Sequence, residues 1–126
     1  MPTNNRHSEC VILLHGLART HLSMRRMERF LKSSGYCVHN IYYPSRNLPI
    51  DELAPLAIGQ GLELCQQNNT QKIHFVTHSL GGILVRHYLQ NRKIEKLGRV
   101  VMLGPPNHGS EIADIMQRLP GYRFIN

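Results

Sequence analysis

The chain has 126 residues and a formal net charge of +7, with 41% hydrophobic and 18% charged residues. This length fits one domain over residues 1–126, and the composition excludes a disordered chain. An apolar run such as residues 11–14 is far shorter than the roughly 20 residues of a membrane-spanning helix, and no secretory signal is evident. The cysteines Cys10, Cys37 and Cys65 are widely spaced without a CxxC pair, which indicates small buried thiols rather than disulfides or a zinc site. We therefore expect a cytoplasmic protein with no metal and no other cofactor.

The charge balance is basic, with 15 Lys and Arg residues against 8 Asp and Glu residues. Such a balance permits attraction to nucleic acid, anionic lipid or acidic substrates without choosing among them. Because the basic residues are scattered instead of forming one block, we expect a solvated basic surface and no specific nucleic-acid partner.

Short apolar runs alternate with helical patterns along the chain. Strands are predicted over 10–14, 36–42, 72–77 and 99–103, and helices over 24–34, 51–67, 80–90 and 110–119. Ser23 is expected to cap the first helix, with Phe30 on its apolar face, and Gly35 to end it. In the second helix Pro55 and two glycines predict a late start or a bend.

This alternation predicts the α/β class: a mainly parallel sheet of about four strands with helices on both faces. Ligands in such sheets bind at the carboxyl ends of the strands. Three loops of unusual composition, 15–20, 77–82 and 104–110, follow strands and are expected to meet at that rim.

The loop at 77–82 carries the chemistry. A serine at a sharp strand-to-helix corner, as Ser79 is here, has a strained backbone and an exposed hydroxyl, which is the logic of the G-x-S-x-G nucleophile elbow. Gly81 lets the helix pass close to a strand, and Thr77 stands where the pattern has its first glycine. The alternative interpretation is a serine that merely caps the helix.

The loop at 15–20 supplies a partner for this serine. An acyl-transfer enzyme needs two preorganised N–H donors for the developing oxyanion, each typically worth about 3 kcal/mol. The backbone amides of Leu17, after His15-Gly16, and of Leu80, after the serine, are the natural pair.

Three segments together, VILLHGL at 11–17, HFVTHSLGG at 74–82 and VVMLGPPNHGS at 100–110, resemble the α/β-hydrolase superfamily, most closely its small bacterial lipase and esterase members. The resemblance extends from Cys10 to about Leu119. It implies the N-terminal part of an α/β-hydrolase fold, a nucleophile at Ser79 and an oxyanion hole at Leu17 and Leu80.

The family's catalytic triad runs in the order Ser, acid, His, and this chain departs from it. The histidines after Ser79 are His87 and His108, and neither is preceded by an acid at the family's position. His108 is the candidate substitute base, with a plain rim role as the alternative. His78 is expected to point away from the serine, and the spacing of His74 and His78 on a strand does not aim both at one metal.

We therefore expect a serine hydrolase of the lipase or carboxylesterase type, acting through an acyl-enzyme on a small ester or lipid, and weak or inactive in this short, incomplete domain. The alternative is a non-catalytic remnant of the fold that binds through its basic surface. The strand at 99–103 is expected to be an exposed apolar edge, which predicts a homodimer paired across it.

Overall fold

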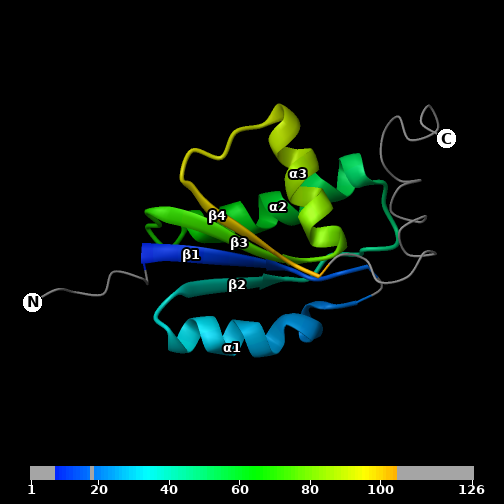
Figure 1. Ribbon diagram of the computed structural model, residues 1–126. Coiled ribbons are helices and arrows are strands. Elements are labelled where there is room, and N and C mark those ends of the chain that lie inside the picture. Colours follow the sequence, from blue (N-terminus) through cyan, green and yellow to red (C-terminus); the bar gives the residue numbers. More distant parts are fainter. Residues whose placement is uncertain (1–7, 18, 105–126) are drawn as a thin grey trace, which may run out of the picture.

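The structure is a computed structural model that describes residues 8–17 and 19–104. Its centre is a sheet of four parallel strands in the order β2-β1-β3-β4 (Figure 1). The strands are β1 (Glu9–Leu14), β2 (Cys37–Ile41), β3 (Lys72–His78) and β4 (Leu97–Leu103). The helices are the short 3-10 helix η2 (His21–Met24) and the α-helices α1 (Arg25–Ser33), α2 (Ile50–Gln66) and α3 (Leu80–Asn91).

The helices cover both faces of the sheet: α1 lies on one face, and α2 and α3 lie on the other (Figure 1). Alternation along β1 divides its side chains between two cores. Ile12 and Leu14 belong to the larger core under α2 and α3, and Val11 and Leu13 to the smaller core with Met24. Every residue of β1 from Cys10 to Leu14 is buried, as expected for a central strand of a parallel sheet.

The predicted fold class is confirmed, and the four strands and three of the four helices lie close to their predicted positions. Gly35 follows the end of α1 and has φ +100°, a conformation that glycine adopts without a steric penalty. The predicted helix at 110–119 and most of the loop at 104–110 lie outside the described residues.

Three local predictions are wrong. The cap of the first helical segment is Thr20, whose hydroxyl accepts a hydrogen bond from Leu22 N–H, whereas Ser23 lies inside η2 and donates its hydroxyl to the Thr20 carbonyl. The second helix does not start late: it begins at Ile50 and continues through Pro55, because its face toward the sheet is buried along its whole length. Phe30 is also not on the buried face, since 64% of it is exposed.

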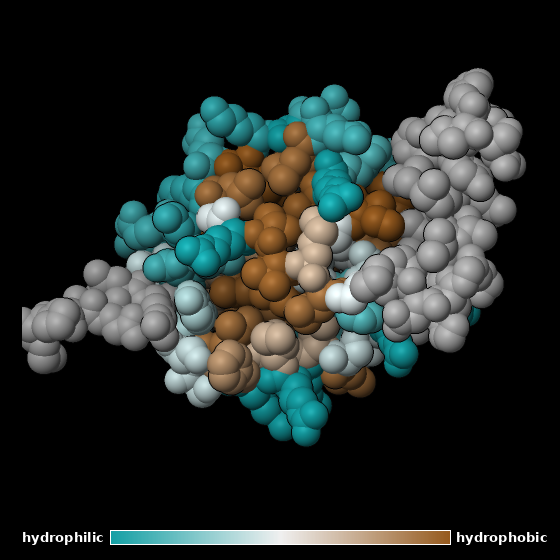
Figure 2. Space-filling view, viewed as in Figure 1, coloured by the Kyte–Doolittle hydropathy of each residue, from teal (hydrophilic) through white to brown (hydrophobic). Residues whose placement is uncertain are grey.

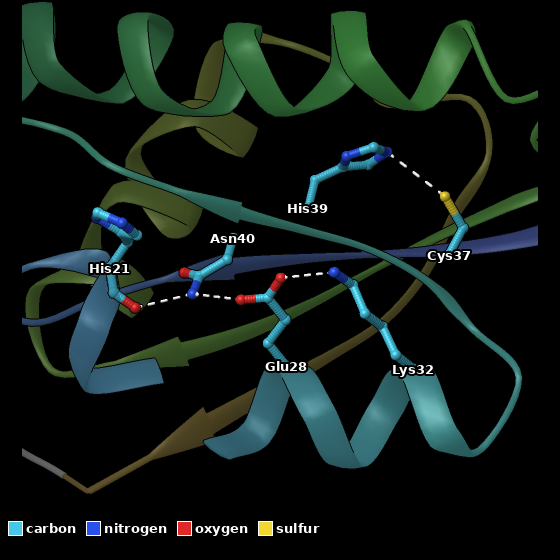
Figure 3. Close-up of polar contacts among 6 residues, drawn as sticks. All are labelled: His21, Glu28, Lys32, Cys37, His39 and Asn40. Atoms are coloured by element: carbon cyan, nitrogen blue, oxygen red, sulfur yellow. Dashed lines mark hydrogen bonds and ion pairs between the residues drawn. The ribbon is translucent and has the colours of Figure 1, made fainter. Parts of the chain in front are cut away.

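A polar network attaches α1 to β2 (Figure 3). The Asn40 side chain donates to the carbonyl of His21 at 2.8 Å and to the carboxylate of Glu28 at 3.0 Å. Lys32 donates to the other oxygen of Glu28 at 2.8 Å. The hydrogen bond from Lys32, and then the one from Asn40, lower the pKa of the Glu28 carboxyl and keep it ionised.

β4 is an edge strand of the described sheet, as predicted. Val101 and Met102 are 47% and 44% exposed, and Figure 2 shows hydrophobic surface across the side of the molecule on which β4 lies. A hollow of about 650 Å³ lies beside this strand, lined by residues that include Tyr36, His74 and Val101. No helix among the described residues is long and apolar enough to cross a membrane.

Candidate active site

Ser79 occupies the one-residue corner between β3 and α3, with φ +52° and ψ −112°. This left-handed conformation is disfavoured for a residue with a Cβ by about 1–3 kcal/mol. It persists because β3 and α3 fix both sides of the corner: the Ser79 N–H donates to the Leu103 carbonyl at 3.4 Å, and its carbonyl accepts from Gly82 N–H at 3.0 Å. The strained corner predicted from the sequence is therefore present.

The alternative in which this serine caps the helix is wrong. Ser79 stands at the N-cap position of α3, but its side chain makes no capping hydrogen bond. A capping serine has extended backbone and bonds the helix through its hydroxyl, and Ser79 has neither property.

Gly81 allows α3 to approach β1 closely. A Cβ at this position would lie 2.7 Å from the carbonyl oxygen of Leu14, a contact that neither backbone can relieve without moving. The sequence predicted this close approach, and the structure identifies the neighbouring strand as β1.

Thr77 fits in place of the pattern's first glycine because α3 makes room for it. Thr77 is fully buried, and its hydroxyl lies 3.2 Å from the place where a side chain on Gly82 would begin. This hydroxyl has no hydrogen-bond partner among the described residues. The second glycine of the Gly81-Gly82 pair thus compensates for the missing first glycine.

The two predicted oxyanion donors, Leu17 and Leu80, both belong to the larger buried core, which extends along the whole sheet. Leu80 is the first residue of α3, where backbone N–H groups have no acceptor within the helix and the helix dipole favours negative charge. Leu17 follows β1 in the loop that faces the corner. The role of these two amides as oxyanion donors stays a prediction.

Sequence reasoning missed the residues that hold the Leu17 loop. The buried ring of His15 stacks on Tyr43 at 4.0 Å, donates from Nδ1 to the Gly16 carbonyl at 2.9 Å and accepts from Tyr43 N–H at 3.3 Å. The Tyr43 hydroxyl donates in turn to the His15 carbonyl. Burial lowers the pKa of His15, and this effect is larger than the opposite effect of the backbone hydrogen bonds with Gly16 and Tyr43. The ring is therefore neutral, and its role is structural.

The two histidines of β3 have neighbours of their own in the structure. The ring of His78 lies between Gly16 and Gly104, within 2.6 and 3.6 Å of where their side chains would begin. His74 Nε2 is hydrogen-bonded to the carboxylate of Glu9 at 2.7 Å, a pairing of imidazole and acid like that of a triad, but it lies toward the opposite end of β3. His108 lies outside the described residues, so its predicted role as substitute base stays a prediction.

The four-stranded parallel sheet and the strained serine corner at the end of β3 are those of the α/β-hydrolase fold. The sequence matches the palmitoyl protein thioesterase family over residues 10–120. The chain therefore belongs to the palmitoyl protein thioesterase family. The predicted superfamily is confirmed, and the narrower lipase or esterase assignment stays a prediction.

Solved structures with the same fold include the following two. An extracellular α/β-hydrolase from a Paenibacillus species, described as a structural and functional homologue of tobacco salicylic acid binding protein 2, superposes with a TM-score of 0.56 at 17% identity over 78% of this chain. Phospholipase PlaB from Legionella pneumophila superposes with a TM-score of 0.56 at 21% identity over 80% of this chain. The chain spans 42% and 26% of these two proteins, and it matches the N-terminal part of the α/β-hydrolase fold.

Proposed function

We propose that this chain carries the nucleophile and oxyanion hole of a serine acyl hydrolase that cleaves a fatty acyl thioester. The observation that carries the proposal is the left-handed backbone of Ser79 at the end of β3, a strained position that a purely structural serine has no reason to occupy. The family membership supports the thioester, because a palmitoyl protein thioesterase by its name acts on a palmitoyl group joined through sulfur.

In the proposed reaction the Ser79 hydroxyl attacks the thioester carbonyl while a base takes its proton. The amides of Leu17 and Leu80 stabilise the oxyanion of the tetrahedral intermediate. Collapse breaks the C–S bond, releases the thiol with a proton and leaves the acyl group on Ser79, and water then hydrolyses this ester. The neutral, buried His15 acts by holding the Leu17 loop and not as the base, because both of its ring nitrogens are engaged.

The base and its acid are proposed to lie outside the described residues. Without them a serine site keeps only about 10³–10⁴-fold acceleration over water, since loss of the triad histidine costs on the order of 10⁶ in turnover. His108 is the candidate base within this sequence.

The test is hydrolysis of an S-palmitoyl peptide and of the matching O-palmitoyl ester by the full chain. We expect release of palmitate from the thioester at a rate above buffer alone, abolished in Ser79→Ala and unchanged in Ser33→Ala, which removes an exposed hydroxyl from α1. A rate that is equal in the wild type and Ser79→Ala would refute the nucleophilic role. Faster cleavage of the oxygen ester than of the thioester would instead favour the carboxylesterase activity expected from the sequence.

The second candidate is a non-catalytic member of the fold that acts by binding. The net charge of +7 supports an anionic partner for it. Binding to anionic vesicles that is salt-dependent and unaffected by Ser79→Ala, together with no thioester cleavage, would favour this second function.

A further inference from the structure

The three cysteines, far apart in the sequence, meet at the amino end of the sheet. Cys10 begins the buried part of β1 and is in register with Cys37, the first residue of β2. Cys65 lies near the end of α2, which packs over the same face of the sheet. All three are free thiols, and Cys10 and Cys65 are fully buried.

A histidine completes this group. The side chains of His39 and Cys37 extend from β2 toward α2, whereas the Asn40 side chain extends to the other face of the sheet, toward α1 (Figure 3). The His39 Nε2 atom lies 3.5 Å from the Cys37 sulfur. One ligand atom each of Cys10, His39 and Cys65 lie within 4.8 Å of one another.

These separations suit tetrahedral coordination. With Zn–S bonds of about 2.3 Å and Zn–N bonds of about 2.0 Å, tetrahedral ligands lie roughly 3.8 Å apart for two sulfurs and roughly 3.5 Å apart for sulfur and nitrogen. The distance from Cys37 Sγ to His39 Nε2 is already 3.5 Å, and the ligand atoms of Cys10, His39 and Cys65 need to approach one another by about 1 Å. Cys37 is not one of that group of three, so its sulfur must also move toward the two buried cysteines when the metal binds.

We propose that Cys10, Cys37, His39 and Cys65 form a binding site for a thiophilic divalent cation, with Zn²⁺ as the expected metal. Three S–H bonds break and three Zn–S bonds form, the three protons pass to solvent, and the neutral His39 ring supplies its lone pair. Four protein ligands leave no open position, so the site is structural and joins β1, β2 and α2.

The surroundings of the cluster suit a structural site. Cys10 and Cys65 are fully buried, so water is excluded from two of the four proposed ligands. The Cys10 thiol donates to the Thr70 hydroxyl at 2.9 Å, and that hydroxyl donates to the Cys65 carbonyl at 2.6 Å, so Thr70 must turn its proton toward the sulfur when Cys10 becomes a thiolate.

One existing contact must change. His39 Nε2 now donates to the side-chain oxygen of Asn68 at 2.8 Å, so the ring must shift its proton to Nδ1 when Nε2 binds the metal. Asn68 is exposed and follows α2, so its amide can turn toward solvent. The site is separate from the proposed active site: Cys10 and Leu14 are about 13 Å apart along β1, and Ser79 lies beyond the Leu14 end.

The experiment is a titration of the reduced, metal-free full chain with Co²⁺ alone. We expect one equivalent to produce a thiolate-to-cobalt charge-transfer band and the intense visible bands of tetrahedral cobalt, and Zn²⁺ to displace it. His39→Ala and Cys37→Ser, both at partly exposed positions, are expected to weaken Co²⁺ binding by more than about tenfold, the lower range for loss of a supporting residue. The matched control is His87→Ala on α3, which removes an imidazole outside the cluster and should bind as the wild type does.

Circular dichroism of each variant establishes that it is folded before binding is compared. No charge-transfer band at one equivalent would overturn the proposal. So would a band that is equally strong in folded His39→Ala and Cys37→Ser, or air oxidation to an internal disulfide that added Co²⁺ does not prevent.

Discussion

The strain at Ser79 predicts an unusual order of stability among its variants. Ser79→Ala and Ser79→Gly both remove the hydroxyl, but only glycine also removes the Cβ that makes φ +52° unfavourable. Comparing these two variants with each other therefore isolates the backbone strain from any contact of the hydroxyl.

The magnitude follows from two opposing terms. Relief of the left-handed conformation favours glycine by about 1–2 kcal/mol, and the greater freedom of glycine in the unfolded chain opposes it by about 0.5–1 kcal/mol. We expect Ser79→Gly to be more stable than Ser79→Ala by about 1 kcal/mol, or about 4 °C in Tm for a chain of this size.

The assay is urea unfolding with linear extrapolation, followed by circular dichroism and compared at equal m-values. Arg86, exposed within α3, provides the matched control, because there alanine should be more stable than glycine by about 1 kcal/mol. If Ser79→Gly is less stable than Ser79→Ala by the same margin as at Arg86, the corner is not strained and the reasoning is refuted.

Three further predictions concern the surroundings of the corner. Gly82→Ala should destabilise the chain by about 1 kcal/mol, because the new methyl group crowds Thr77, and this cost should be smaller when Thr77 is also replaced by alanine. If urea unfolding gives the same cost with and without the Thr77→Ala substitution, Gly82 does not compensate for Thr77. Because the pKa of buried His15 is lowered, the unfolded chain binds more protons than the folded chain below about pH 6.5, and the stability of the fold should decrease as the pH drops from about 6.5 through the lowered pKa. In thermal unfolding measured across this pH range, His15→Gln should lose part of the dependence, whereas the control variant His87→Gln should keep it. Identical pH profiles for the two variants would show that His15 does not contribute. We propose that two copies pair through β4, and Val101→Lys should reduce the mass measured by light scattering from dimer toward monomer; a monomeric wild type at the same concentration would contradict the pairing.

The features predicted from sequence are those that local residues determine. The elbow at Ser79 follows from a strand, one residue and a helix in succession, and the stop at Gly35 follows from one glycine. Both are visible within a few residues, because backbone conformation there depends on the chain's immediate neighbours.

The features that were missed depend on contacts between distant segments. His15 is held by Tyr43, 28 residues later, and the neutral ring could not be inferred from the turn that it begins. The cysteine cluster requires the register of β1 with β2 and the position of the end of α2, none of which spacing reveals. The helix cap was misplaced because Thr20 and Ser23 are both good capping residues, and the 3-10 turn between them decides which one caps.

The central claim, an activated nucleophile at Ser79, is tested most directly by intact mass before and after exposure to a fluorophosphonate probe. The account predicts one adduct on the wild-type chain, assigned to Ser79 by peptide mapping and absent from Ser79→Ala. A folded wild-type chain with no adduct, or an adduct that persists in Ser79→Ala, would contradict it.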